Sequence, residues 1–316
     1  MVDLTVVILT KNEEKNLKKC IDSFHGIAKR FVLIDSYSTD STLDVAASLG
    51  ADVYQHPFTT HAAQKNWGIE NAEINTEWVM SIDADEELTP ELAAEIDEKL
   101  PQLDESITGI ELKRRLYFMG RWIKHGGKYP EIHLRIFRKE KAEFEHAIMD
   151  EHMVLKEGSR IRFKHDFIDN NTKTLEWWIG KHNWYSDLEV NDYKNKKLAL
   201  IGSVPLSPVV GDKTSYYTEQ IDQREYVEPK LFGTNTERKK WLKYIVYYKT
   251  PLMVRAHWYF IYRYYFKLGF LDGKQGLIFH FLQGYWYRFL VDAKLFEMEQ
   301  TGVVYKNLED LKQMKK

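Results

Sequence analysis

The chain has very little cysteine and almost no charge imbalance, and both features narrow its class. Cys20 is the single cysteine among 316 residues, so an intrachain disulfide is excluded and a reducing compartment is expected. The formal net charge is -2, which gives no electrostatic basis for nucleic-acid binding. No basic segment precedes the short apolar run at the amino terminus, so a first β-strand is expected there instead of a signal peptide. These absences favour a cytoplasmic protein.

Apolar runs alternate with helix-like segments through the first hundred residues. A capping residue and a proline, Thr89 and Pro90, mark the start of the last of these helices. The patterns predict strands at 4–9, 30–35, 51–55 and 77–82, and helices around 17–24, at 38–50, at 61–72 and from Pro90 onward. This order predicts an α/β fold with a mostly parallel sheet and helices on both faces.

Polar residues follow three of these predicted strands. They are Thr10 to Glu13, Asp35 with Ser36, and Asp83 with Asp85. In parallel sheets, ligands bind beyond the carboxyl ends of the strands, so the three clusters are expected to meet at one rim. Acids in such positions also form ordinary turns and helix caps, which is the alternative for each cluster taken singly.

Four segments carry a family resemblance. "VVILTKNEEKNLKKCIDS", "LIDSYSTDSTLDVA", "QKNWGI" and "SIDADEE" together resemble glycosyltransferase family 2, the inverting enzymes with the Rossmann-like GT-A fold. The similarity covers roughly 1–170, with a second block at 250–299. Within the family it is closest to the branch that adds glucose or heptose-type sugars to lipopolysaccharide cores and related surface glycans. The resemblance implies transfer of a hexose, with glucose expected, from a UDP-linked donor to a lipid-linked or oligosaccharide acceptor.

The acids of "SIDADEE" need a positive partner, and the divalent cation that accompanies a diphosphate donor would supply it. Mg²⁺ or Mn²⁺ can balance the departing diphosphate while one or two carboxylates hold the ion. The motif of the resembling family assigns Asp85 as the direct ligand and Asp83 as a contact to the ribose or to a metal-bound water. His165 matches a family histidine that approaches the phosphates or the metal; a hydrogen-bonded core histidine is the alternative. Glu86 and Glu87 are expected in a solvated turn.

The same resemblance places the nucleotide. Asp35 would accept a hydrogen bond from a base N–H, although relatives often carry two adjacent acids where this chain has Asp35 and Ser36. Thr10, Asn12 and Glu13 are expected near the base and ribose. Lys65 would meet the diphosphate as a point charge, where many relatives use arginine.

Inversion by single displacement needs a general base on the acceptor side. The segment 143–155 is the candidate because it places acids after a predicted strand at 131–139. Alignment with a recurring His-Glu pair of the resembling branch assigns Glu151, with Asp150 as the alternative. The nearby histidines could form a metal site instead, but no H-E-x-x-H motif or cysteine-containing ligand set is present.

Three regions are expected along the chain. Residues 1–190 are assigned to a catalytic domain, with the nucleotide-sugar half at 1–100 and the acceptor half at 101–190. Residues 191–236 are polar and contain Pro205, Pro208 and Gly211, as in a linker or insertion. Residues 237–316 are assigned to an aromatic-rich helical region.

The last region has an amphipathic pattern. Wound as a helix, it places Arg255, Arg263 and Lys267 in one arc, with the apolar residues Val254, Trp258, Ile261, Tyr265 and Leu268 facing away. Three cations argue against a bilayer-spanning helix at 251–271. A peripheral helix at the inner face of the cytoplasmic membrane is expected, and core helices with outward-reaching cations are the alternative.

Two other functions compete with glycosyl transfer. A nucleotidyltransferase would share the fold class and the Asp-bound metal, but it needs a glycine-rich phosphate loop, and "LTKNEEKN" has no glycine. A non-catalytic sugar-binding protein on the same fold is the third possibility, against which the acids Asp83, Asp85 and Glu151 argue.

Overall fold

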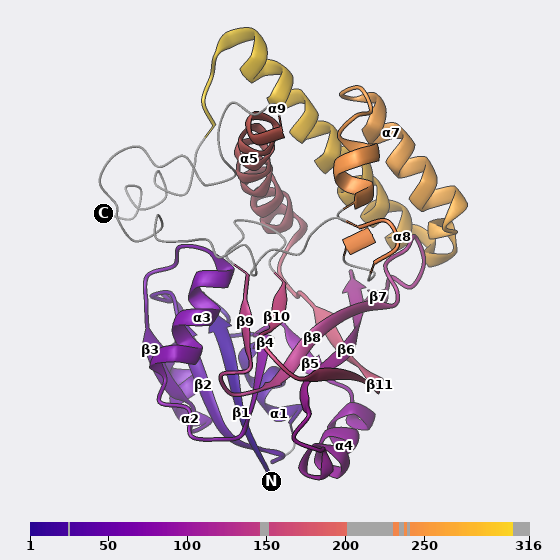
Figure 1. Ribbon diagram of the computed structural model, residues 1–316. Helices are drawn as coiled ribbons and strands as arrows, with labels where there is room; N and C mark the ends of the chain where they lie inside the picture. Colours follow the sequence, from indigo (N-terminus) through magenta and orange to yellow (C-terminus); the bar gives the residue numbers. More distant parts are fainter. Residues whose placement is uncertain (25, 146–151, 201–229, 234–236, 239–240, 306–316) are drawn as a thin grey trace. The chain divides into compact units, whose positions relative to one another are not determined.

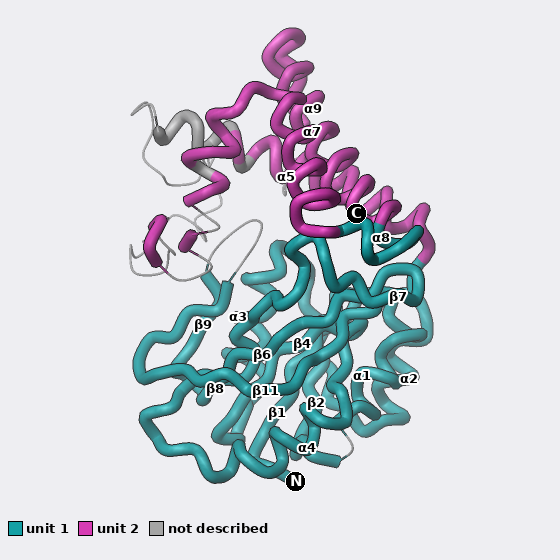
Figure 2. Tube along the Cα trace, turned by 90° about the vertical axis from the view of Figure 1, so that its right-hand side faces the viewer, with its two compact units in different colours: residues 1–173, 269–276 teal, residues 174–268, 277–316 magenta. Residues whose placement is uncertain are grey.

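The computed structural model describes the chain except for residues 25, 146–151, 201–229, 234–236, 239–240 and 306–316, which are drawn as a grey trace in Figure 1. The chain divides into two compact units, coloured teal and magenta in Figure 2. Unit 1 contains residues 1–173 and 269–276. Unit 2 contains residues 174–268 and 277–316.

Unit 1 is built around a single large sheet. Its strands are β1 (Val2–Thr10), β2 (Ala28–Asp35), β3 (Asp52–Gln55), β4 (Trp78–Asp83), β5 (Glu86–Leu88), β6 (Ile107–Phe118), β7 (Arg121–Trp122), β8 (Glu131–Arg138) and β11 (Ser159–Asn170). A separate two-stranded sheet contains β9 (Ala142–Phe144) and β10 (Met153–Leu155). The helices are α1 (Leu17–Asp22), α2 (Thr42–Ser48), α3 (His61–Asn71), α4 (Pro90–Lys99) and the short η1 (Leu100–Gln102).

The large sheet has the strand order β3-β2-β1-β4-β8-β6-β11-β5, with β7 paired to β6. Its first four strands are parallel to one another, as predicted. Antiparallel pairing begins where β8 joins β4 and continues between β8 and β6, whereas β6 and β11 are again parallel. The α/β class with a mostly parallel sheet is confirmed.

Helices cover both faces of the parallel strands. On one face, α1, α2 and α4 contribute to a core around alternate β1 residues such as Val6 and Ile8. On the other face, α3 packs on Val7 and Ile34. Gly68 permits this approach, since a Cβ at that position would lie 2.5 Å from Ile34 Cγ1. The alternating burial follows from the period of two in a strand.

Unit 2 is helical. Its elements are α5 (Leu175–Leu200), η3 (Leu242–Tyr247), α7 (Val254–Ile261), η4 (Tyr262–Phe266), η6 (His280–Trp286) and α9 (Tyr287–Thr301). Two further segments are η5 (Gly269–Asp272) and α8 (Gly273–Phe279). Their residues 269–276 belong to unit 1, and the chain re-enters unit 2 at Leu277. The apolar core of unit 2 consists of residues packed around Val190, Tyr287, Val291 and Leu295. A C-terminal helical region is therefore present, as predicted.

Helix α5 continues through residue 190, where the catalytic domain was predicted to end, and reaches Leu200. Most of the predicted insertion, 201–229 and 234–236, lies outside the described residues.

The three cations of the predicted arc in the last region do not share one environment. Arg255 and Arg263 are buried, whereas Val254, Trp258 and Tyr265 are exposed. Lys267, the third cation of the arc, is exposed as well. Arg255 is held in the interior because Asp292 Oδ1 accepts hydrogen bonds from its Nε at 2.8 Å and its Nη2 at 2.5 Å. A buried pair of this kind offsets the cost of removing both charges from water.

Glu95 joins α4 to strand β11. Its buried carboxylate accepts hydrogen bonds from the backbone N–H groups of Lys164 and His165, each at 3.0 Å, and from Lys99 Nζ at 2.8 Å. Burial acts to raise the pKa of Glu95, but these bonds outweigh it and lower the pKa to about 2. The ionised form is therefore bound more tightly in the folded protein than in the unfolded chain.

Glu95→Gln should lower the free energy of unfolding at neutral pH by about 1–3 kcal/mol, because a charge-assisted acceptor is lost. The folded pKa lies below the ordinary value of 4.5, so the contribution of Glu95 is present above that value and disappears as pH falls toward 2. Urea titrations of both proteins at a series of pH values measure this. The exposed neighbour Glu98→Gln is the control, and a wild-type advantage that persisted near pH 2 would contradict the assignment.

Candidate functional site

The carboxyl ends of β1, β2 and β4 bring three predicted site residues to one edge of the sheet. Thr10 is the register partner of Asp35, and Leu9 is the register partner of Asp83. The three polar clusters therefore meet at one rim, as the parallel arrangement predicted. This rim lies where open α/β sheets bind ligands.

Asp35 is fully buried, and protein groups surround its carboxylate. Oδ1 accepts hydrogen bonds from Thr10 Oγ1, at 3.0 Å, and from Ser38 Oγ. Oδ2 accepts from Ser38 N at 2.9 Å and from Gln55 Nε2 at 3.3 Å. A carboxylate offers about four lone-pair positions. A nucleotide base could bind Asp35 only by replacing one of these donors.

Asn12 and Glu13 tie the end of β1 to neighbouring loops. Asn12 Oδ1 accepts from Thr39 N at 2.8 Å, and Asn12 N donates to Ser38 Oγ at 2.9 Å. Glu13 accepts from Asn16 Nδ2 at 2.8 Å and pairs with Lys173. Burial raises the pKa of Glu13 despite these contacts. Both residues thus lie at the rim and shape the backbone around it.

Lys65 and Asp83 form a charge pair at the rim. Lys65 Nζ lies 3.3 Å from Asp83 Oδ1 and 5.0 Å from the centre of the Phe144 ring. Burial acts to raise the pKa of Asp83, but the charges of Lys65 and Arg135 outweigh it and hold the pKa well below its usual range. Asp83 is therefore ionised, with a buried lysine beside it. Helix α3 supplies this lysine to the rim, as predicted.

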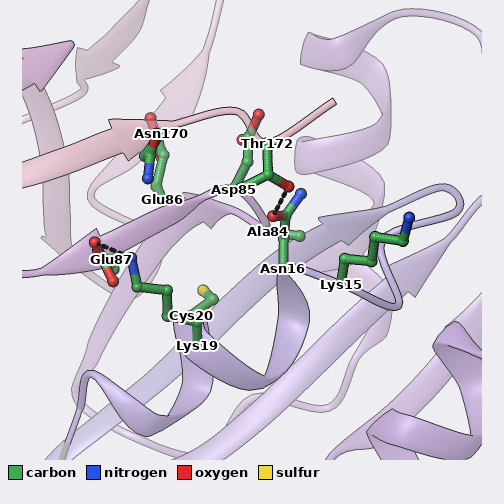
Figure 3. A pocket seen from close by; sticks show the side chains of 10 residues that line it. All are labelled: Lys15, Asn16, Lys19, Cys20, Ala84, Asp85, Glu86, Glu87, Asn170 and Thr172. Atoms are coloured by element: carbon green, nitrogen blue, oxygen red, sulfur yellow. Dashed lines mark hydrogen bonds and ion pairs between the residues drawn. The ribbon is translucent and has the colours of Figure 1, made fainter. Parts of the chain in front are cut away.

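Asp85 borders a pocket close to the end of β11. Its Oδ2 accepts a hydrogen bond from Asn171 Nδ2 at 2.7 Å, and its backbone carbonyl accepts from Asn170 N at 3.0 Å. Figure 3 shows this pocket, with Asp85 and Asn16 among the side chains around it. The lining residues come from α1 and the two residues before it, the turn between β4 and β5, strand β5, and the end of β11 with the segment after it: Lys15, Asn16, Lys19, Cys20, Ala84, Asp85, Glu86, Glu87, Asn170 and Thr172.

Glu86 is not in a solvated turn, contrary to the expectation. It is buried, its Oε1 accepts from Arg135 Nη2 at 2.5 Å, and its Oε2 accepts from Asp83 N at 2.9 Å. Burial raises the pKa of Glu86 to about 8 although Arg135 opposes the change. Glu87, one position along strand β5, points to the other side and pairs with Lys19 at 2.7 Å.

Asp169 is a further acid at the rim, and the sequence analysis missed it. It is the register partner of Glu86 and pairs with Arg114 Nη1 at 3.1 Å. Burial, together with repulsion from Asp85 and Asp83, raises the pKa of Asp169 to about 6 against the attraction of Arg114. The signal was present in "DNNTK" (169–173), a polar run directly after a strand.

His165 has a different neighbour from the one predicted. Its Nδ1 lies 3.0 Å from Glu95 Oε2, so the structure places it with α4, as in the hydrogen-bonded alternative. The predicted bases Glu151 and Asp150 lie outside the described residues. At the flank of that segment, the buried Glu145 accepts from His152 N at 3.1 Å.

The donor set at the rim suits a hard divalent cation. Within the described ranges, no group of three His, Cys, Asp or Glu side chains is arranged to enclose a metal ion. A cation that bridges phosphates needs only one or two carboxylates from the protein. Asp83, Asp85 and Asp169 are brought to this rim by β4, the turn after it and β11, and a bound cation would offset their charges. The residues therefore fit Mg²⁺ or Mn²⁺.

An α/β fold with an acid-rich rim beyond its parallel strands places polar side chains where open α/β sheets bind ligands. Residues 5–157 match the family model described as Glycosyl transferase family 2. The match covers just under half of the chain.

Curated relatives support the same domain. An uncharacterized glycosyltransferase of Rickettsia typhi is 39% identical over 97 residues, which are 31% of this chain and 32% of the relative. The glycosyltransferase SunS of Bacillus subtilis is 35% identical over 85 residues, 26% of this chain and 20% of the relative. The chain thus spans about a third or less of the length of these relatives.

Solved structures that match part of the chain include S. aureus TarS in complex with UDP-GlcNAc. It is 17% identical, with a TM-score of 0.37, over 59% of this chain and 66% of that chain. Glucosyl-3-phosphoglycerate synthase from Mycobacterium tuberculosis, in complex with Mn²⁺, UDP and product, is 23% identical with a TM-score of 0.30. That match covers 36% of this chain and 44% of the other.

Arg135→Met should lower the free energy of unfolding by about 1–3 kcal/mol, because Glu86 Oε1 would lose its buried hydrogen-bond donor. In the double variant Glu86→Gln/Arg135→Met the loss should be smaller than the sum of the two single losses, since both partners of that bond are changed together. Guanidinium titrations of the four proteins measure this coupling. Arg160→Met, which removes an exposed arginine, is the control; additive losses would show that the pair is not coupled.

Proposed function

We propose that this protein is an inverting glycosyltransferase that moves a hexose from a nucleotide diphosphate sugar to an acceptor hydroxyl. The observation that carries the proposal is the rim itself: Asp83 and Asp85 follow a parallel strand, with Lys65 held beside them. Carboxylates that hold a cation and a lysine that meets phosphate are what a diphosphate leaving group requires. The family 2 match over residues 5–157 supports the same reaction class.

In this proposal Asp85 holds the cation and Asp83 contacts the ribose or a water on the cation. Bound Mg²⁺ or Mn²⁺ supplies charge balance to the departing diphosphate. Lys65 adds a second positive charge, and its pairing with Asp83 keeps it at the rim before the donor arrives. Asn171 holds the Asp85 carboxylate in place through its hydrogen bond to Oδ2.

The nucleotide is proposed to bind over Thr10, Asn12, Glu13 and Asp35. Because Ser38 and Gln55 already occupy Asp35, recognition of a base N–H there requires the loop after β2 to give up one of these bonds. The hydroxyl and amide donors are neutral, so exchange for a base N–H replaces one hydrogen bond by a similar one.

The remaining details follow from the resemblance. The donor is proposed to be UDP-linked, with glucose as the sugar, and the acceptor a lipid-linked or lipopolysaccharide-type glycan at the inner face of the cytoplasmic membrane. Glu151 is proposed as the general base that takes the proton of the attacking hydroxyl, with Asp150 as the alternative. A carboxylate in this role must lie within hydrogen-bond reach of that hydroxyl.

Release of UDP from a panel of UDP-sugars should require a divalent metal: EDTA should abolish it and added Mn²⁺ or Mg²⁺ should restore it. Asp85→Ala should remove metal-dependent donor binding, measured by calorimetry, while the far-ultraviolet circular dichroism stays unchanged. The surface variant Asp22→Ala is the matched control, since it removes only an exposed pair with Lys18. Pyrophosphate release in place of UDP would favour a nucleotidyltransferase, and full turnover in EDTA would refute the metal role.

Glu151→Gln should leave donor affinity unchanged and lower kcat by about 10²-fold or more, because the amide cannot accept the proton. Single-turnover kinetics with a saturating donor separates the chemical step from binding. Glu157→Gln, which changes a carboxylate that pairs with Lys141 at the surface, is the control. An equally large loss in Asp150→Asn, with an active Glu151→Gln, would move the base by one position.

A further inference from the structure

One helix of unit 2 exposes a stripe of aromatic and aliphatic side chains, here named the aromatic face. It consists of Val254, Trp258, Tyr262, Tyr265 and Phe266 on α7 and η4. Trp258 is 63% exposed and Phe266 is 74% exposed. Four of the five recur at every fourth position, which places them on one side of the helix. An exposed apolar stripe of this kind marks an interaction surface.

The opposite side of the same helix holds its arginines in the interior. Arg255 is 2% exposed and Arg263 is 4% exposed. Arg255 bonds to Asp292, and Arg263 Nη1 donates to Gln283 Oε1 at 2.8 Å. A helix that faces water shows the reverse arrangement, with its cations outward and its aromatic residues inward. Burial of both guanidinium groups leaves the outward side free for apolar contact.

The side of the helix away from the aromatic face packs on the following helical segment. Phe260 makes an edge-to-face contact with Phe281 of η6, with ring centroids 6.4 Å apart. Phe260 also stacks on Tyr264 at 5.3 Å. These contacts fix the helix against its neighbour within unit 2.

The chain segment that carries the aromatic face is poor in acids. Residues 241–291 contain a single acid, Asp272, which is buried and bonded to His125 N at 2.9 Å. Lys267 is exposed, and its Nζ lies 5.6 Å from the ring centre of Tyr262. Cations beside exposed aromatic rings suit an apolar layer bordered by negative groups.

We propose that the aromatic face docks on the surface of a bilayer that contains anionic lipids. Trp and Tyr favour the headgroup level of membranes, and a nearby lysine is attracted to an anionic surface. No helix among the described residues is both long enough and apolar enough to cross a bilayer, so contact is with one leaflet. A symmetric pair of copies would instead bring like-charged lysines together.

This docking concerns unit 2 alone and does not require the proposed reaction. Only its benefit for a lipid-linked acceptor rests on the proposed function, because confinement to the surface would raise the encounter rate with such an acceptor. Vesicle binding and turnover are therefore separate measurements, and each can fail without the other.

The full-length protein should co-sediment with vesicles of phosphatidylcholine and phosphatidylglycerol and bind much more weakly to phosphatidylcholine alone. The double variant Trp258→Ser/Phe266→Ser should reduce binding about tenfold or more, since two inserted rings are lost. Lys267→Glu should reduce binding to the anionic vesicles while leaving the weak binding to neutral ones unchanged.

Phe232→Ser is the matched control, because Phe232 is 98% exposed but is not part of the aromatic face. Circular dichroism and thermal unfolding check that every variant is folded. The proposal would be overturned if the wild-type protein did not co-sediment with the anionic vesicles. It would also be overturned if the double variant bound them as strongly as the wild-type protein does. Sedimentation velocity that showed a dimer broken by Trp258→Ser/Phe266→Ser, with no lipid binding, would assign the face to self-association instead.

Discussion

The structure of unit 1 depends on how carboxylates are kept together at one edge of its sheet. Asp83, Asp85, Glu86 and Asp169 arrive there from three strands and a turn, and like charges so placed repel. Lys65, Arg135 and Arg114 offset them, each by an ion pair with one acid. Arg135 and Arg114 complete the cluster from strands β8 and β6, so the antiparallel half of the sheet stabilises the end of the parallel half.

The cations do not stabilise the ionised forms of the four acids equally. Asp83 is held ionised by its cations, whereas the pKa of Asp169 is raised to about 6 by burial and by neighbouring acids. Asp85, by contrast, is held by the neutral amide of Asn171. A divalent ion carried in with a diphosphate would complete the balance, which is why this edge suits a nucleotide-sugar site.

Local sequence patterns predicted many elements correctly, but they could not distinguish adjacent acids. Glu86 and Glu87 look equivalent in "SIDADEE", yet one is buried against Arg135 and the other pairs with Lys19. The period of two in a strand separates them, and only the pairing of β5 with β11 shows that a strand forms there. The helix formed by α7 and η4 in unit 2 also has contacts that its local sequence did not predict. Its cations were visible in the spacing, but only the distant partners Asp292 and Gln283 show that Arg255 and Arg263 are buried.

The sequence by itself determined the alternation of strands and helices, the parallel pairing of the first strands and the meeting of Thr10, Asp35 and Asp83 at one rim. These properties follow from hydrophobic periodicity and chain direction, which are local. Tertiary structure alone brought Asp169 and Asn171 close to Asp85 and buried Glu86 against Arg135. It also decided which donors bind the carboxylate of Asp35 and that His165 lies beside Glu95. Each of these except the Asp35–Ser38 contact joins residues dozens of positions apart, and no local pattern specifies which distant donor reaches a buried acid.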